Sequence, residues 1–147
     1  MSTSNATTNA PAQTATTQPY IFFYGRCQEA LDFYGRIFGG TSEIMRVKDA
    51  PAEYSGGMPG DLVMHAQFTS PILVFQASDG RETKAVDPDE GNVAVSIRIN
   101  DAADADRICK ELSDGGNARW PLSEAFWGGR FANIVDRFGT EWMISAA

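Results

Sequence analysis

The residues best suited to chemistry in this chain lie on one predicted strand and in one glycine-rich loop. His65 and Gln67 alternate along the stretch LVMHAQFT (62–69), so both side chains point to the same face of a strand. His65 is the only histidine, and an imidazole titrates near neutral pH and can act as an acid or a base. A hydrogen-bonded structural histidine is the alternative, and the residues alone leave both interpretations open.

The loop is the stretch FWGGRF (126–131). Trp127 offers a flat wall for a ligand, and Gly128 and Gly129 allow the backbone to approach it closely. Arg130 can bind a carboxylate or a phosphate with two parallel hydrogen bonds. The alternatives are an aromatic that packs on the sheet or on a partner chain, and an arginine paired with Asp136 or another acid at the sheet edge. The candidate ligand-binding residues are therefore His65, Gln67, Trp127 and Arg130, with His65 the one candidate for catalysis.

Composition limits the partners. The chain has 147 residues, enough for one domain with a real core, and a net charge of −7 at pH 7. This acidity disfavours nucleic acids and anionic membrane surfaces, which reward clustered Lys and Arg. There is no apolar run long enough to span a membrane and no visible signal peptide, so we expect a cytoplasmic protein. Cys27 and Cys109 fall in helical patterns without a metal-type spacing, which predicts buried thiols.

The chain divides into a tail and one domain. Residues 1–18 are rich in Thr, Ala, Asn and Gln and carry no charge, so they are predicted to form a disordered tail. The folded domain is predicted over 19–147, in two modules at about 19–78 and 92–146.

Both modules show the same order of elements. In the first, a short aromatic strand (20–24) precedes a helix (27–38), a Gly-Gly cap and strands at 42–47, 62–69 and 72–77. In the second, a strand (92–99) precedes a helix (101–114), another Gly-Gly pair and strands at 117–123, 130–136 and 141–146. Two βαβββ modules indicate an α+β fold in which the helices cover one face of a curved, mixed sheet and the other face lines a cleft.

This pattern resembles the vicinal oxygen chelate superfamily of glyoxalases, bleomycin-resistance proteins and dioxygenases, and more closely its PhnB-like branch. The matching stretches are PYIFFYGRCQEALDFYGRIFGG (19–40), MHAQF (64–68), ILVFQASD (72–79) and FWGGRFANIVDRFGTEWMIS (126–145). The resemblance implies paired βαβββ modules and a homodimer that completes or encloses the cleft. Members of this branch are often described as resembling 3-demethylubiquinone-9 3-methyltransferase. We find no support for methyl transfer, because no glycine-rich loop follows a predicted strand and opens a helix.

The resemblance also implies where a metal would bind. Metal-dependent members hold a divalent ion with His, Gln or Glu from the first and last strands of each module. Here the corresponding positions are Pro19, Gln76, Ala94 and Met143, so at most one carries a suitable ligand. We therefore expect no cofactor, although a divalent metal at a non-standard site is not excluded.

The sequence thus predicts a protein that binds a small apolar or aromatic ligand with an anionic handle, without the standard metal site. The alternative is a lyase, isomerase or dioxygenase-type enzyme that uses His65 and a non-standard divalent metal.

Overall fold

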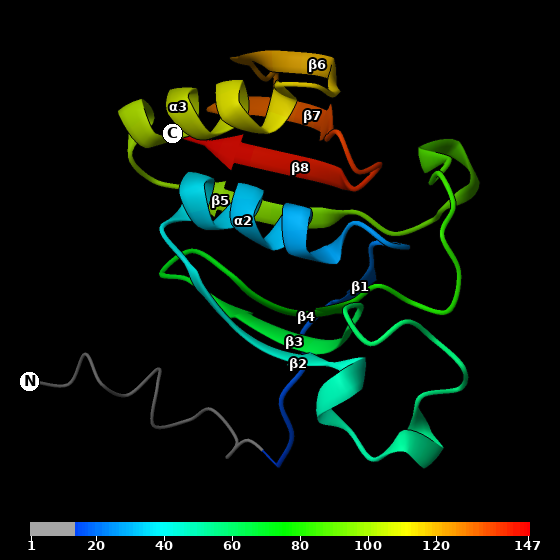
Figure 1. The fold of residues 1–147 in the computed structure, drawn as a ribbon. Coiled ribbons are helices and arrows are strands. Elements are labelled where there is room, and N and C mark those ends of the chain that lie inside the picture. The colour runs from blue at the N-terminus through cyan, green and yellow to red at the C-terminus, as the bar shows by residue number, and fades with distance from the viewer. Residues whose placement is uncertain (1–13) are drawn as a thin grey trace, which may run out of the picture.

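The computed structural model describes residues 14–147, so most of the predicted tail (1–18) lies outside the described residues. The first module contains the elements β1 (Tyr20–Phe22), α2 (Cys27–Phe38), β2 (Thr41–Arg46), β3 (Val63–Thr69) and β4 (Val74–Ser78). The second contains β5 (Val95–Ile99), α3 (Ala102–Ser113), β6 (Asn117–Glu124), β7 (Arg130–Val135) and β8 (Glu141–Ala146). The predicted pair of βαβββ modules is confirmed (Figure 1).

Each module forms its own four-stranded sheet. The first sheet has the order β1-β4-β3-β2 and the second β5-β8-β7-β6. In both sheets the first strand of the module pairs in parallel with the last, and the other pairs are antiparallel. The strand predicted at 117–123 is observed as β6, an edge strand that contains Pro121 and whose pairing with β7 is irregular between Trp120 and Ser123. A proline is tolerated there because an edge strand needs hydrogen bonds on one side only.

One end of each helix has a local cap. Asp101 precedes α3 and its side chain accepts a hydrogen bond from the Asp104 N–H, as an N-cap should. Gly39 ends α2 in the left-handed conformation (φ 71°) and its N–H bonds to the Gly35 carbonyl. No helix within residues 14–147 is long and apolar enough to cross a membrane.

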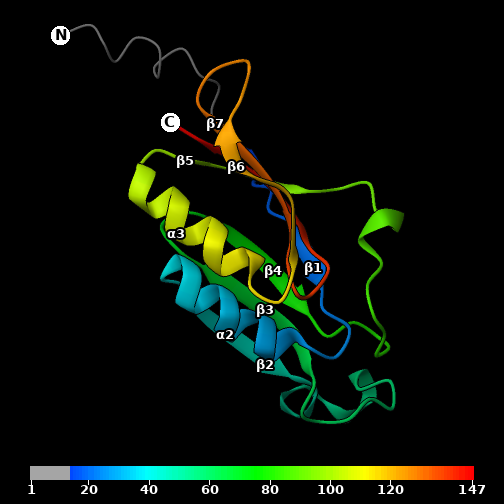
Figure 2. The same ribbon diagram turned by 90° about the horizontal axis from the view of Figure 1, so that it is seen from above.

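One core joins the two modules. The helices α2 and α3 lie side by side (Figures 1 and 2). The Tyr34 ring from α2 meets the Trp142 ring from β8, with centroids 5.6 Å apart, and both side chains are fully buried. The face of each sheet turned toward its helix is apolar and buried. We call the opposite face the open face, and it is there that side chains are available to a ligand.

Candidate functional site

His65 and Gln67 lie on the open face of the first sheet. Their neighbours Ala66 and Phe68 are buried on the helix side, as strand alternation requires. The Tyr20 hydroxyl lies 3.3 Å from His65 Nδ1. The Gln67 amide donates to Gln18 Oε1 at 2.7 Å and also to backbone carbonyls. Gln67 therefore serves contacts within the chain, whereas His65 has one contact, with a partly exposed tyrosine.

Arg130 does not lie in the cleft predicted for it. Its Cα is paired with Ala146 of β8, a residue buried on the α3 side of the second sheet. The guanidinium donates to Asp106 Oδ1 of α3 at 2.8 Å. The structure thus places Arg130 on the helix side of β7, away from the open face on which the ligand cleft was expected. The acid-paired alternative describes it better, with Asp106 rather than Asp136 as partner.

Trp127 borders a pocket of about 570 Å³ on the open face of the second sheet. We call it the aromatic pocket; it is lined by Arg119, Trp120, Glu124, Ala125, Phe126, Trp127, Phe131, Asn133, Glu141 and Met143. Trp127 and Phe131 meet edge to face with ring centroids 5.6 Å apart. Trp127 remains 62% exposed and Phe126 97% exposed. These two adjacent aromatic side chains therefore leave apolar surface open beside the pocket.

Three strands supply the polar groups of the aromatic pocket. Asn133 of β7 donates to Glu141 Oε2 of β8 at 3.0 Å, which holds that carboxylate at one end of the pocket. Arg119 of β6 is bound to Asp89 Oδ1 at 2.6 Å. Sequence reasoning did not single out Asn133, Glu141 or Trp120 for a ligand site. The sequence does contain one indication of this site, because Glu141 and Met143 alternate with the buried Trp142. This alternation points to the pocket only once β7 is known to pair with β8.

The four predicted residues therefore fall into three places. His65 and Gln67 share the open face of the first sheet, Trp127 borders the aromatic pocket of the second, and Arg130 lies on the helix side. One chain does not bring them together.

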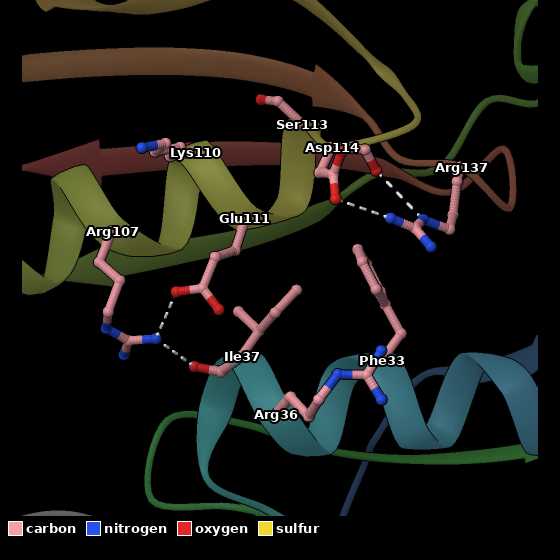
Figure 3. A pocket seen from close by; sticks show the side chains of 9 residues that line it. All are labelled: Phe33, Arg36, Ile37, Arg107, Lys110, Glu111, Ser113, Asp114 and Arg137. Atoms are coloured by element: carbon pink, nitrogen blue, oxygen red, sulfur yellow. Dashed lines mark hydrogen bonds and ion pairs between the residues drawn. The ribbon is translucent and has the colours of Figure 1, made fainter.

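Another hollow, with a volume of about 620 Å³, lies between the helices (Figure 3). Its charged side chains are largely committed to the fold. Arg107 donates to the Ile37 carbonyl at the end of α2 and to Glu111, at 2.9 and 3.0 Å. Arg137 donates to Asp114 just beyond α3 and covers the Phe33 ring at 4.4 Å. Both arginines satisfy carbonyls at helix ends, which indicates a structural role.

A smaller pocket of about 320 Å³ lies on the first sheet. Tyr54 and Met58 of the long loop 48–61 line it together with Tyr20, Phe22 and Met64 of the strands. The loop thus lies over part of the open face.

The buried polar groups near the core serve the fold. Asp79 accepts hydrogen bonds from the backbone N–H groups of Cys27 and Val63, at 2.8 and 2.7 Å. Burial raises the pKa of the Cys27 thiol to about 12 and that of Cys109 to about 11. Both cysteines are free and buried, as predicted. A thiol with such a pKa stays protonated at neutral pH and is a poor nucleophile.

The positions that correspond to the superfamily's metal ligands do not fit a divalent ion. Met143 offers a thioether, to which the Asn133 amide donates at 3.2 Å, and a thioether suits soft metals rather than Mg²⁺ or Mn²⁺. Pro19 contributes only a carbonyl, which accepts from the Gln76 N–H. Over residues 14–147 no three His, Cys, Asp or Glu side chains gather in a way that could hold a metal.

Comparison with known proteins identifies relatives over nearly the whole chain. A family model described as 3-demethylubiquinone-9 3-methyltransferase matches residues 15–145. The chain is similar to protein PA1353 from Pseudomonas aeruginosa, with 28% identity and a TM-score of 0.75 over 90% of this chain and 98% of that one. It is also similar to a PhnB protein from Bacillus cereus, with 21% identity and a TM-score of 0.73 over 90% of this chain and 100% of that one.

A glyoxalase/bleomycin resistance protein/dioxygenase superfamily member from Sphaerobacter thermophilus shares the fold more distantly. Its identity is 19% and its TM-score 0.55, over 92% of this chain and 100% of that one. The predicted glyoxalase-like architecture is thereby confirmed.

Proposed function

The chain belongs to the PhnB-like family described as 3-demethylubiquinone-9 3-methyltransferase, and from its site we propose that it binds a small apolar or aromatic molecule in the aromatic pocket. The observation that carries this proposal is the wall of Trp120, Trp127 and Phe131 on the open face. Pockets of this size, mostly apolar with a few fixed polar groups, are the usual form of small-molecule sites.

The proposal differs from the sequence-based prediction in the polar handle. Arg130 was the residue expected to bind an anionic group, and it is paired with Asp106 on the other side of the sheet. Arg119 is the one cationic residue in the lining of the pocket, and it is paired with Asp89. An anionic handle would have to compete with Asp89 for this guanidinium.

We do not extend the proposal to a reaction. Neither helix is entered through a glycine-rich loop of the kind that holds a nucleotide-type cofactor, since α2 follows Tyr24-Gly25-Arg26 and α3 follows Asn100-Asp101. The alternative of a metal-dependent enzyme that uses His65 gains no support either. The imidazole of His65 contacts the Tyr20 hydroxyl rather than further side chains that could bind a metal.

A homodimer is part of the proposal. The open faces leave apolar side chains such as Phe22, Met45 and Val74 about half exposed. In one chain the His65 surface and the aromatic pocket belong to different sheets. A second copy that covered these faces would bury apolar area and would allow His65 of one protomer to approach the pocket of its partner.

The proposal is tested by NMR on the indole N–H signals of the three tryptophans. A neutral aromatic probe, 1-naphthalenemethanol, should shift the signals of Trp120 and Trp127. It should leave that of Trp142 in place, because this indole is fully buried and bonded to Asp136. Trp127→Ala should weaken binding about three- to tenfold, the contribution of one aromatic contact.

Arg130→Ala is the matched control, since it alters a neighbouring side chain on the opposite face of the sheet and should leave the affinity unchanged. A probe that shifts neither exposed indole, or an equal loss in both variants, would refute the proposal.

A further inference from the structure

We infer that the aromatic pocket selects an organic cation, with an ammonium group beside Glu141 and an apolar or aromatic body over Phe131 toward Trp127. This inference rests on the proposed function, because it assigns a charge to the ligand of the same pocket.

The charges of the pocket point in this direction. Its lining holds three ionisable side chains, Arg119, Glu124 and Glu141. Arg119 is already neutralised by Asp89 at 2.6 Å. Neither carboxylate has an ion-pair partner among residues 14–147. The pocket therefore presents two uncompensated negative charges, in a chain whose net charge of −7 also attracts cations.

The aromatic walls favour a cation as well. A ring carries negative charge density on its face, so a cation within about 6 Å of the ring centroid is attracted to it, most strongly by tryptophan. Trp120 and Trp127 both line the pocket and are both more than half exposed, so that their surfaces are available to a ligand. An anion would meet these same walls and carboxylates unfavourably.

The strand pairing decides which carboxylate holds the cation. Glu141 stands opposite Val135, at the far end of β7, whereas Glu124 stands opposite Arg130 at its start. The two carboxylates therefore mark opposite ends of the pocket, separated by the length of β7. Glu141 is half-buried and is oriented by the Asn133 amide at 3.0 Å, while Glu124 is exposed and has no such contact. A carboxylate already held in place loses less entropy when it binds a cation.

Trp120 lies at the same end of the aromatic pocket as Glu141. Its Cα is paired with that of Asn133, the residue that orients Glu141. An ammonium at Glu141 thus lies at the end of the pocket that Trp120 borders, and the ligand body extends along the open face of β7 past Phe131.

Three probes with the same naphthalene body and different charge test the inference: 1-naphthylmethylamine as its ammonium, 1-naphthalenemethanol and 1-naphthoate. Binding is followed on the Trp120 and Trp127 indole N–H signals, with Trp142 as the internal reference. The ammonium should bind about five- to tenfold more tightly than the alcohol, as expected for one cation–π contact and one partly exposed ion pair, and the carboxylate least tightly. High salt should reduce this preference and leave the alcohol unaffected.

Variants test which carboxylate binds the ammonium group. Glu141→Gln should reduce the preference for the ammonium about three- to fivefold while the affinity for the alcohol stays unchanged. Glu124→Gln should have a smaller effect. Glu82→Gln, which changes an exposed carboxylate in the loop between β4 and β5, is the matched control and should change neither.

The outcomes separate this inference from the proposed function. If the alcohol binds as tightly as the ammonium, or if the naphthoate binds most tightly, the pocket is a ligand site but does not select cations, and the inference is wrong. An unchanged preference in Glu141→Gln also overturns it. If none of the three probes shifts the two exposed indoles, the inference and the proposed function fail together.

Discussion

Tyr34→Phe tests how the core holds the strands that build the aromatic pocket. The Tyr34 hydroxyl of α2 donates to Asp136 Oδ2 in the turn between β7 and β8. The same carboxylate accepts from the Trp142 indole at 2.9 Å and from the backbone N–H groups of Phe138 and Thr140 at 2.9 and 3.1 Å. Tyr34 is fully buried and Asp136 nearly so. The substitution removes one of four donors to a buried carboxylate and leaves the ring in place.

The expected cost follows from the charge of the acceptor. A hydrogen bond to a charged group contributes roughly 1.5–3 kcal/mol, and water cannot replace it at a site that is closed to solvent. We expect the free energy of unfolding to fall by about 2 kcal/mol at neutral pH, a large fraction of the stability of a domain of this size.

The pH dependence has a definite sign. Burial raises the pKa of Asp136 in the folded chain, and its hydrogen bonds, that from Tyr34 first, oppose this shift. With its folded pKa above the unfolded one, this group makes the chain less stable as pH rises between the two values. The variant lacks a donor that favours the charged form, so the folded pKa rises further. The loss in the free energy of unfolding caused by Tyr34→Phe is therefore largest above the pKa of Asp136 in the folded chain. It is smallest below the pKa of Asp136 in the unfolded chain, where the carboxyl is protonated in every state.

The assay is urea unfolding of both proteins at pH 7 and at about pH 4, close to the ordinary pKa of an aspartate. Tyr20→Phe is the control, since it removes an exposed hydroxyl 3.3 Å from His65 and should cost less than about 0.5 kcal/mol. A loss below that level for Tyr34→Phe at pH 7, or a loss that does not shrink in acid, would show that the hydroxyl does not stabilise a charged Asp136.

Two further predictions concern the loop and the assembly. Gly129→Ala should lower the free energy of unfolding by about 1–3 kcal/mol, because Gly129 has a φ of 68° and an added Cβ would lie 2.6 Å from the Ala146 carbonyl oxygen. Gly91→Ala is the control, with no atom within 4 Å of the added Cβ, and an equal effect in thermal unfolding of both variants would contradict this reasoning. Light scattering after size exclusion should give about twice the chain mass of 16.0 kDa. Val74→Lys on the open face should shift the protein toward monomer. A wild-type chain that runs as a monomer at micromolar concentration would remove the dimer from the proposal.

The order of elements and the ends of both helices could be predicted from the sequence. The apolar spacing in 27–38 and the Gly39 cap act through neighbours three or four residues apart, and α2 has those bounds. Asp136 in the last turn accepts from the Phe138 and Thr140 N–H groups, an arrangement typical of an aspartate in a turn. These features depend on residues that are close together in the sequence, so the sequence pattern is enough to predict them.

The candidate site was only partly predictable. Trp127 was named because an aromatic beside two glycines is conspicuous in any register, and the structure places it at the border of the aromatic pocket. Arg130 was named as a candidate for ligand binding, whereas the structure places it on the helix side of β7; one position along a strand reverses the direction of a side chain. Its true neighbour, Asp106, lies 24 residues away in the chain. Nothing local indicates that pairing.

The sequence by itself determined the family pattern, the two modules and the acidic, aromatic composition from which any site had to be built. Only the tertiary structure decided that β7 lies between β6 and β8, which brings Trp120, Trp127, Asn133 and Glu141 into the lining of one pocket. It also decided that His65 lies on a different sheet. The physical reason is that periodicity specifies which face of an element is apolar, whereas the neighbours of its other face depend on how strands distant in sequence are paired.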